Sequence, residues 1–350
     1  MSRPSPAAAA TGAVIAGTPA TRGPRAGADP SPAILAEGLV KRFGKVTALE
    51  GIDLRVPYGT VVGLLGPNGS GKTTTVRILT TLLVPDAGRA VIAGVDTKDA
   101  PERVRPLIGM AGQYAAVDPN LTGRENLIMV GRLAMLPRRA ARQRADDLLD
   151  QFDLQEVADR PSRTYSGGLR RRLDLAAALV HRPKLLFFDE PTTGLDPGSR
   201  RDLWAVLEQL AAGGTTTLLT TQYLEEADHL ADQIVVLDRG KIIAQGTPAQ
   251  LKAEFGTSVV DIRFPDGTAA SRAARILSVA ANHAAQRGHH VEIPVSASTE
   301  SAMEILRTLQ AHDLSPSGFV LREPSLDDVF LALTGHSTAG ATDHQEAVEG

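Results

Sequence analysis

Short apolar runs alternate with segments of helical spacing from residue 34 to about residue 246. Three of the apolar runs are bounded by turn residues: residues 61–65, 184–189 and 216–221. Short apolar strands with helices between them are typical of a largely parallel sheet that is buried on both faces. Residues 234–237 and 241–243, separated by a short Asp-Arg-Gly turn, predict a β-hairpin. The pattern therefore predicts an α/β domain over residues 34–247, with a mixed and mainly parallel sheet.

A helical stretch interrupts the sheet pattern between Leu121 and Arg160. Thr122 and Glu125 have the spacing of a capping box, in which Thr122 caps a helix and the Glu125 side chain reaches back to it. Residues 138–152 carry apolar side chains at helical spacing. We therefore expect a helical subdomain over about residues 114–165, inserted into the α/β domain.

The pattern changes after Pro248. Strands and helices are expected to alternate there: strand 258–264, helix 268–286, strand 291–295, helix 301–309, strand 319–322 and helix 325–333, which Ser325 caps. This order predicts a small C-terminal α+β accessory domain over residues 248–335. The first tail, residues 1–33, is rich in Ala, Pro and Gly and is expected to be disordered, as is the similar tail at residues 336–350.

Composition narrows the class of protein. The 350 residues are enough for two domains, and 43% hydrophobic with 22% charged residues is typical of a globular protein. The net charge of −3 gives no reason to expect non-specific nucleic-acid binding. The absence of cysteine excludes disulfides and thiolate metal sites. No apolar run approaches the roughly 18–20 residues that cross a bilayer.

Residues 66–74 read GPNGSGKTT, which is the P-loop pattern between a predicted strand and a predicted helix. Glycines allow backbone N–H groups to converge on phosphate oxygens, and a helix N-terminus adds its dipole. Lys72 can reach the β- and γ-phosphates, and Thr73 can bind Mg²⁺. The candidate nucleotide-binding residues are Gly66, Pro67, Asn68, Gly69, Ser70, Gly71, Lys72, Thr73 and Thr74.

Two carboxylates, Asp189 and Glu190, end the predicted strand 184–189. We expect this strand to lie beside the one that precedes the P-loop. Asp189 can bind Mg²⁺, directly or through water. Glu190 can align and deprotonate a water for in-line attack. Carboxylate pairs at strand ends are common, so we assign metal binding and base chemistry to them only because a P-loop is also predicted.

A second anion-binding pattern, YSGGL, lies at residues 165–169. Ser166 offers a hydroxyl, and Gly167 and Gly168 expose backbone N–H groups at a helix start. One nucleotide needs only one P-loop, so a second such helix end suggests a site shared between two chains. The three arginines at residues 170–172 could form a phosphate clamp or a solvated helix face, and we expect the solvated face.

The ordered set of motifs resembles the ATP-binding subunits of ABC transporters over about residues 39–246. GPNGSGKTT resembles the Walker A motif, LLFFDEP the Walker B motif, YSGGL the signature motif and TGLDP the D-loop. The resemblance places Gln113 in the Q-loop, beside Mg²⁺ and the γ-phosphate. It places Asp196 in the D-loop at the nucleotide, and Phe43 where the family stacks an aromatic ring on adenine.

A closer resemblance is to the daunorubicin/doxorubicin-resistance type of ATP-binding subunit, through YSGGLRRRLDLAAALV, LLTTQYLEEAD and EPSLDDVFLALTG. This resemblance implies an ATPase that powers export of a drug, an antibiotic or a lipid. The chain departs from the family at two positions, with Gln222 in place of histidine and Leu169 in place of glutamine at the end of the signature. Gln222 can donate to a phosphate oxygen or to the attacking water but cannot titrate near neutral pH. We therefore assign base-like work to Glu190 and sensing to Gln222, the alternative being a strand-end glutamine that faces solvent.

The resemblance also implies a mechanism and partners. Two copies would form a head-to-tail homodimer around two ATP–Mg²⁺, with Lys72 and Thr73 of one copy facing Ser166 and Gly168 of the other. A separate transmembrane permease would supply the pathway, with this chain at the cytoplasmic face of the membrane. No nucleic-acid partner is expected.

Two alternatives remain. Soluble ABC proteins that act on ribosomes or DNA usually carry two cassettes or a long coiled coil, and the roughly 95 residues between Gly71 and Ser166 are too few for a coiled coil and a cassette core. A single-site P-loop kinase or GTPase would leave YSGGL and TGLDP unexplained. The C-terminal domain could regulate, stabilise the dimer or contact the permease.

Overall fold

The computed structural model describes residues 31–112, 117–256, 258–280, 284–295 and 299–335. A six-stranded sheet lies at the centre, in the order β10-β9-β3-β8-β7-β6. Its strands are β3 (Val61–Leu65), β6 (Ile108–Ala111), β7 (Leu185–Asp189), β8 (Thr216–Thr221), β9 (Gln233–Asp238) and β10 (Lys241–Gly246). Five strands are parallel, and β10 pairs antiparallel with β9, which confirms the predicted hairpin.

The predicted position in the sheet of β7, the strand that ends at Asp189, was wrong. We expected β7 to lie beside β3, but β8 lies between them and pairs in parallel with both. All six residues of β8 are buried, so this strand has the character of a central one. The carboxyl ends of all three strands still meet at one edge of the sheet.

Strand β7 shows why strands of the central sheet are continuous apolar runs in the sequence. Leu185 and Phe187 face one hydrophobic core, and Leu186 and Phe188 face the other. Successive side chains of a strand point to opposite faces, so both faces must be covered when all residues are apolar. Helices α5 (Gly167–Ala178) and α6 (Pro197–Ala212) contribute to the core on the Leu186 side.

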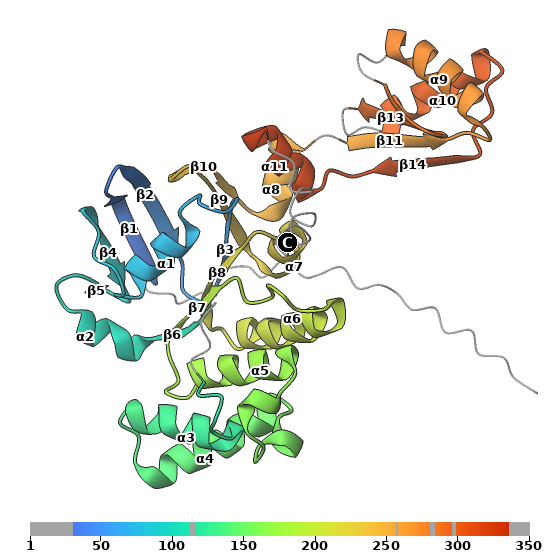
Figure 1. Cartoon of the computed structure of the whole chain (residues 1–350). Helices are drawn as coiled ribbons and strands as arrows, with labels where there is room; N and C mark the ends of the chain where they lie inside the picture. The colour runs from blue at the N-terminus through green and yellow to red at the C-terminus, as the bar shows by residue number, and fades with distance from the viewer. Residues whose placement is uncertain (1–30, 113–116, 257, 281–283, 296–298, 336–350) are drawn as a thin grey trace, which may run out of the picture.

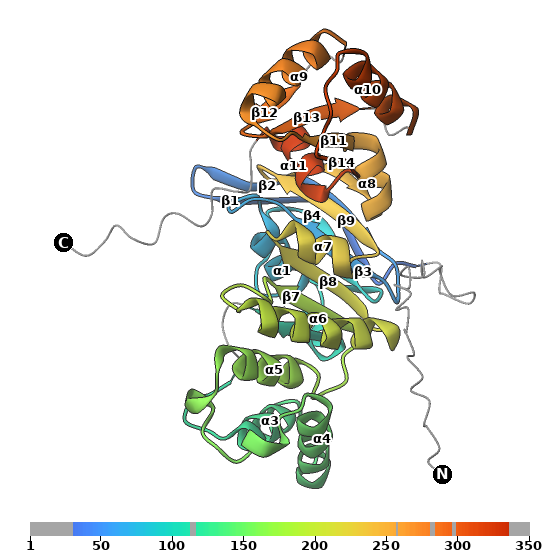
Figure 2. The ribbon, with the colours of Figure 1, turned by 90° about the vertical axis from the view of Figure 1, so that its right-hand side faces the viewer.

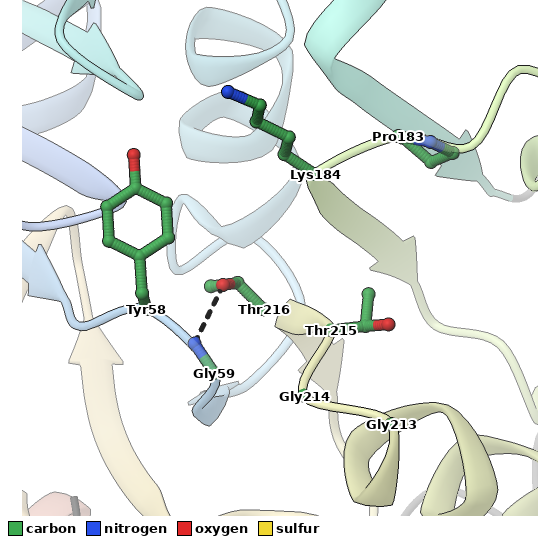
Figure 3. A pocket seen from close by; sticks show the side chains of 8 residues that line it. All are labelled: Tyr58, Gly59, Pro183, Lys184, Gly213, Gly214, Thr215 and Thr216. Atoms are coloured by element: carbon green, nitrogen blue, oxygen red, sulfur yellow. Dashed lines mark hydrogen bonds between the residues drawn. The ribbon is translucent and has the colours of Figure 1, made fainter. Parts of the chain in front are cut away.

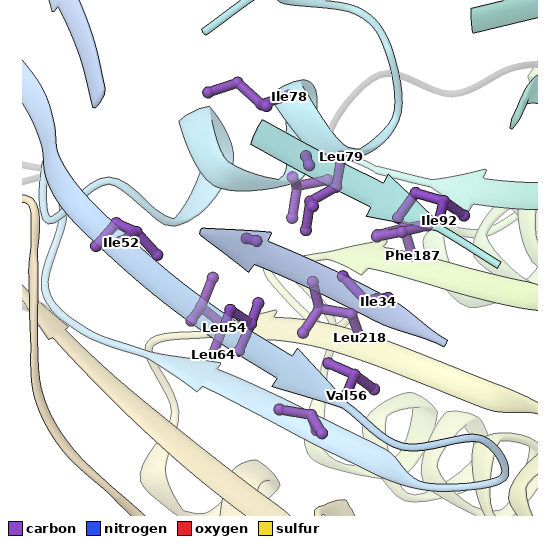
Figure 4. Packing of buried hydrophobic residues seen from close by; sticks show 14 of the residues in the cluster. Ile34, Ile52, Leu54, Val56, Leu64, Ile78, Leu79, Ile92, Phe187 and Leu218 are labelled. Atoms are coloured by element: carbon purple, nitrogen blue, oxygen red, sulfur yellow. The ribbon is translucent and has the colours of Figure 1, made fainter. Parts of the chain in front are cut away.

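A second sheet, which the sequence pattern did not predict separately, covers the other face. It is antiparallel, in the order β2-β1-β4-β5. Its strands are β1 (Ile34–Phe43), β2 (Val46–Val56), β4 (Ala87–Ile92) and β5 (Val95–Asp96). Figure 4 shows its side chains packed against the central sheet and α1 (Lys72–Leu79), with Ile34, Leu54 and Ile92 near Leu64, Phe187 and Leu218. The helix that opens at the P-loop is thus held in the same core as β3.

The helical subdomain contains α3 (Gly123–Leu133) and α4 (Arg138–Gln151) and lies below α5 in Figure 1. Thr122 accepts from the Glu125 backbone N–H at 3.1 Å, and the Glu125 side chain accepts from the Thr122 N–H at 2.9 Å. This confirms the predicted capping box. Two shorter helices, α2 (Pro101–Val104) and α7 (Leu224–Leu230), follow β5 and β8 along the chain.

The C-terminal region forms a four-stranded antiparallel sheet, in the order β12-β13-β11-β14, set apart from the other sheets in Figures 1 and 2. Its elements are β11 (Ser258–Arg263), α9 (Gly267–Ala280), β12 (Ala285–Arg287), β13 (His290–Val295), α10 (Thr299–Ala311) and β14 (Gly318–Arg322). The helix predicted for residues 268–286 was too long, because residues 285–287 pair with β13 instead.

Two helices connect this region to the central sheet. Helices α8 (Pro248–Phe255) and α11 (Leu326–Thr334) pack together, and α11 also packs against α7. Leu251, Val329 and Phe330 share a hydrophobic core with Ile234 and Val236 of β9. The end of the chain thus returns to the first domain, although the boundary predicted near residue 247 stays a prediction. At the other predicted boundary, Ala33 is fully buried and bonded to β2.

Over the ranges given above, the chain has no helix with the length and apolar character needed to cross a membrane.

Candidate functional site

The P-loop, residues 66–74, runs from the end of β3 to the first turn of α1, as the sequence predicted. Gly71 has φ +111°, and a Cβ there would lie 2.8 Å from the Ala48 carbonyl oxygen. A Cβ on Gly66 would lie 2.3 Å from the Leu237 carbonyl oxygen. Both positions require glycine, because neighbouring backbone leaves no space. The Gly240 N–H donates to the Ser70 carbonyl at 3.0 Å, so the β9–β10 turn supports the loop.

Lys72 lies inside this loop with 4% of its side chain exposed. Its Nζ donates to the carbonyls of Gly66 at 2.8 Å and Pro67 at 3.1 Å, and lies 3.7 Å from Glu190 Oε1. Burial lowers the pKa of Lys72, while the carboxylates of Glu190 and Asp189 act to raise it. The ammonium is thus held at the loop by weak acceptors that an incoming phosphate can replace.

Asp189 and Thr73 meet across the loop. Thr73 Oγ1 donates to Asp189 Oδ1 at 3.3 Å, although the two residues are far apart in sequence. Asp189 is buried, and its Oδ1 also accepts from Thr220 Oγ1 at 2.6 Å. A hydroxyl and a carboxylate beside a phosphate-binding loop are hard oxygen donors of the kind that Mg²⁺ prefers.

Sequence reasoning missed Thr220. Its Oγ1 donates to Asp189 and accepts from the Glu190 N–H at 3.0 Å, so one hydroxyl connects both carboxylate residues. A signal was present, since threonine within a fully buried strand must satisfy its hydroxyl internally. The sequence could not show which group it meets.

Glu190 is held in an uncommon backbone conformation. Its φ is +51°, and its N–H is bonded to Thr220 at both the carbonyl and the hydroxyl. Thr193 Oγ1 donates to Glu190 Oε2 at 3.3 Å. A non-glycine residue with positive φ costs free energy, and residues with such a strained backbone are concentrated at functional sites. The turn directs the Glu190 carboxylate back towards Lys72.

The donor set fits ATP with Mg²⁺. The loop offers backbone N–H groups at the start of α1, the Lys72 ammonium and the Thr73–Asp189 oxygen pair. Within the part of the chain that the structure describes, the buried Ser70 Oγ has no hydrogen-bond partner. An unpaired buried hydroxyl in a phosphate loop is a group that a ligand can satisfy.

Of three further predicted residues, the structure describes Gln222 and Phe43. Gln222 directly follows β8, at the edge where β3 and β7 also end, and is half-buried. Phe43 ends β1 with 51% of its surface exposed, and Lys41 Nζ lies 5.7 Å from its ring centroid. Gln113 lies outside the described residues.

The residues of the signature pattern lie at the start of α5. Ser166 caps α5 and accepts from the Leu169 N–H at 3.3 Å, so the predicted helix start is confirmed. A Cβ on Gly168 would lie 2.8 Å from Ser199 Oγ, so a larger residue there would require the Ser199 side chain to shift. Asp196 caps α6 through the N–H groups of Gly198 and Ser199 and the Ser199 hydroxyl, and these bonds lower its pKa. Helix α5 lies apart from α1 in both views, and among the described residues no hydrogen bond joins Ser166 to residues 66–74.

The expectation of a solvated face at residues 170–172 was wrong for Arg171. Its side chain is 14% exposed, and it donates to the carbonyls of Pro191 and Gly112, both at 2.6 Å. It also pairs with Asp174 at 3.2 Å. Burial lowers the pKa of Arg171, and the carboxylates of Asp174 and Glu226 oppose that effect. This arginine therefore ties α5 to the segment that follows Glu190.

A shallow pocket of about 590 Å³ lies at the opposite ends of the strands, where β7 and β8 begin. Figure 3 shows Tyr58 and Lys184 at this pocket, with the Gly59 N–H donating to Thr216 Oγ1 at 2.9 Å. In parallel α/β sheets, ligands bind at the carboxyl ends of the strands. The pocket is therefore separate from the P-loop site.

Comparisons with known proteins agree with this arrangement. The model of the ABC transporter family matches residues 49–193, and that of the C-terminal domain of DrrA1-3-like ATP-binding proteins matches residues 246–334. Daunorubicin resistance ATP-binding protein DrrA2 of Streptomyces coeruleorubidus is 51% identical over 318 residues, which are 90% of this chain and 98% of that protein. Daunorubicin/doxorubicin resistance ATP-binding protein DrrA of Streptomyces peucetius is 47% identical over 91% of this chain and 98% of its own.

A solved structure adds a nucleotide-bound relative. The dimeric ATP-binding cassette MJ0796, in a post-hydrolysis state with ADP and Pi, has a TM-score of 0.56 and 25% identity over 61% of this chain and 98% of that chain. The predicted fold class, a P-loop cassette with a helical subdomain and a small C-terminal α+β domain, is confirmed by the sheets described above and by such structures.

Proposed function

The chain belongs to the ABC transporter family of ATP-binding proteins, in the group of the daunorubicin/doxorubicin resistance ATP-binding proteins, and from this we propose that it powers export of a drug, an antibiotic or a lipid. It is an ABC-type ATPase. The pathway belongs to a separate membrane permease, with this chain at the cytoplasmic face. Substrate class rests on the relatives' names, whereas the chemistry rests on the site. The alternative of an ABC protein acting on ribosomes or DNA is not favoured by these relatives.

Binding of the nucleotide rests on the P-loop. The backbone N–H groups of the P-loop residues other than Pro67 hold the phosphates, and Lys72 leaves the Gly66 and Pro67 carbonyls to contact the β- and γ-phosphates. Phe43 supports the adenine ring at the exposed end of β1. Thr73 and Asp189 would hold the metal, and the family resemblance assigns Gln113 to the same ion. Bound Mg²⁺ would supply positive charge against the charge that develops on the phosphates.

Hydrolysis rests on two groups at the carboxyl ends of the strands. Glu190 accepts a proton from the attacking water, because its turn and the Thr220 bonds fix it beside the P-loop. Gln222 donates from its amide to the γ-phosphate or that water and stays neutral while doing so. The division of work follows from chemistry: a carboxylate can take a proton, and an amide cannot.

The second half of the site comes from another copy of the chain. Ser166, Gly167 and Gly168 form the start of α5, a helix that lies apart from α1 in Figures 1 and 2. In a head-to-tail dimer this end of α5 faces the phosphates bound by the partner, and Asp196 lies at the same junction. Binding therefore closes the dimer, and loss of the γ-phosphate opens it.

The observation that carries this proposal is the meeting of Lys72, Glu190, Asp189 and Thr73 at one loop. Its test is Glu190→Gln. The variant should bind ATP, lose about 100-fold or more of its turnover, and accumulate as an ATP-bound dimer in light scattering. The exposed Glu156→Gln, on the short helix at residues 155–157, is the matched control and should keep wild-type turnover.

Two results would contradict the proposal. Wild-type turnover by purified Glu190→Gln would remove the base assignment. Full activity in a strictly monomeric wild-type chain, with Ser166→Ala equally active, would remove the shared site.

A further inference from the structure

A buried carboxylate lies outside the machinery described so far. Glu226 is on α7, four residues after Gln222, and is fully buried. Its Oε1 accepts from Trp204 Nε1 of α6 at 3.3 Å. Trp204 is the one tryptophan of the chain. Acidic residues are almost never fully buried without partners, so Glu226 needs a reason to be there.

The residues around Glu226 are close in sequence to Glu190 and Gln222, the two groups proposed to act in hydrolysis. Thr192 follows Glu190 by two residues and is fully buried, and Thr221 immediately precedes Gln222. Burial raises the pKa of Glu226, while Thr221, Thr192 and Trp204 lie close enough to favour its charged form. Thr221 Oγ1 also accepts from the Tyr223 N–H at 2.9 Å, which fixes the turn that carries Gln222.

Two arginines bring positive charge to the same place. Arg200 of α6 lies over the Tyr223 ring at 4.7 Å and acts on Glu226 electrostatically. The Glu226 carboxylate also acts to raise the pKa of Arg171 of α5. Arg171 donates to the carbonyl of Pro191, the residue before Thr192. Four buried polar atoms around this point make no direct hydrogen bond to any described residue: Glu226 Oε2, Thr192 Oγ1, Arg200 Nε and Arg171 Nη2. Such a polar cluster is held together chiefly by its charges.

We propose that Glu226 is a positioning residue for ATP hydrolysis, because it bonds the helix that follows Gln222 to Trp204 of α6, within the buried polar cluster that includes Thr192 of the segment after Glu190. This inference rests on the proposed function, since it presumes that Glu190 and Gln222 act together on the γ-phosphate. Glu226 touches neither the nucleotide loop nor the two acting groups. Its effect is to keep the base and the sensor at a fixed separation.

Glu226→Gln tests the proposal, because it keeps the shape and the acceptor for Trp204 but removes the charge that faces two arginines. We expect kcat to fall about tenfold or more while the KM for ATP stays within about twofold, because misplacing acting groups slows the chemical step more than binding. Trp204 supplies an independent readout. Its emission should shift when ATP–Mg²⁺ binds to the wild type, and the shift should be lost in Glu226→Gln.

The neighbouring Glu225→Gln is the matched control, because Glu225 is on the same turn of α7 but exposed. It should leave kcat, KM and the emission shift unchanged. If Glu226→Gln does not fold, Thr192→Val removes one hydroxyl of the cluster at constant size and should lower kcat about three- to tenfold with unchanged KM.

The proposal is overturned if the folded variants keep wild-type kcat, or if kcat and KM change together with a lowered melting temperature. An emission of wild-type Trp204 that ATP–Mg²⁺ leaves unchanged would also count against it. Failure of the proposed function is separate, since that would appear as normal turnover by Glu190→Gln with Glu226 intact.

Discussion

At the scale of single residues, Lys72 is bonded to groups that it must leave when it binds phosphate. It bonds to two loop carbonyls and faces Glu190, so the same ammonium orders the loop and is available to phosphate. Lys72→Ala should weaken ATP binding by about 10- to 100-fold, because hydrogen bonds to charged groups contribute about 1.5–3 kcal/mol. Titration with a fluorescent ATP analogue measures this. Lys184→Ala, at the opposite edge of the sheet, should bind normally; equal affinities for Lys72→Ala and wild type would be incompatible with the assigned role.

Arg171 supports a second prediction at this scale. Removing its guanidinium leaves the carbonyls of Pro191 and Gly112 and the buried Asp174 carboxylate without that donor. Arg171→Met should lower the free energy of unfolding by about 2–4 kcal/mol, because buried partners lose a charged donor. Urea unfolding followed by Trp204 fluorescence is the measurement. Arg170→Met changes an exposed neighbour and should cost less than about 0.5 kcal/mol. Equal losses in both variants would refute the structural role.

These residues also show what the sequence could and could not predict. The P-loop and the carboxylates were predictable, because phosphate and metal chemistry demand fixed residue types at fixed spacing. Arg171 was not, because an arginine beside two other arginines on a helix carries no sign of which one points inward. Thr220 and Glu226 were missed for a related reason: their partners come from other strands and helices, which local pattern does not reveal.

At the scale of elements, local signals determined helix starts well and strand order poorly. The capping box at Thr122 and the caps at Ser166 and Ser325 appeared where the sequence placed them. Caps are local, since the side chain bonds to a backbone group two or three residues away. Strand order is not local. The position of β8 between β3 and β7 depends on which strand takes the centre, and all three strands are fully buried, so burial does not distinguish them.

The capping box gives a prediction for one element. Thr122→Ala removes the side-chain acceptor of the Glu125 N–H and should lower the free energy of unfolding by about 1 kcal/mol, because an N–H of the first turn of α3 loses its partner. Chemical unfolding followed by circular dichroism measures it. Thr122→Ser keeps a hydroxyl and should recover most of the loss. If serine were as damaging as alanine, packing of the threonine methyl rather than the cap would be responsible.

At the scale of the whole molecule, the last helix belongs physically to the first domain. The chain leaves the cassette after α8, builds the sheet of β11–β14, and returns through α11. Val329 and Phe330 then pack in one core with Leu65 of β3 and with β9. Residues on both sides of the predicted boundary at residue 247 share this core, and pattern along the chain does not show where a later helix will dock.

We therefore expect the packing of α11 to contribute to the stability of the cassette. Phe330 is 3% exposed, so Phe330→Ala leaves a cavity between α11 and the central sheet and should cost about 3–5 kcal/mol. Leu331, its neighbour on α11, is 49% exposed, and Leu331→Ala should cost less than about 1 kcal/mol. Trp204 lies in α6, in the cassette, so its fluorescence reports whether the loss reaches that domain. If α11 stabilises only the C-terminal region, the urea midpoint of Trp204 will not move in Phe330→Ala. A midpoint that falls in Phe330→Ala but not in Leu331→Ala would show that the cassette requires its last helix to be stable, and that the C-terminal sheet is inserted between two parts of one folding unit.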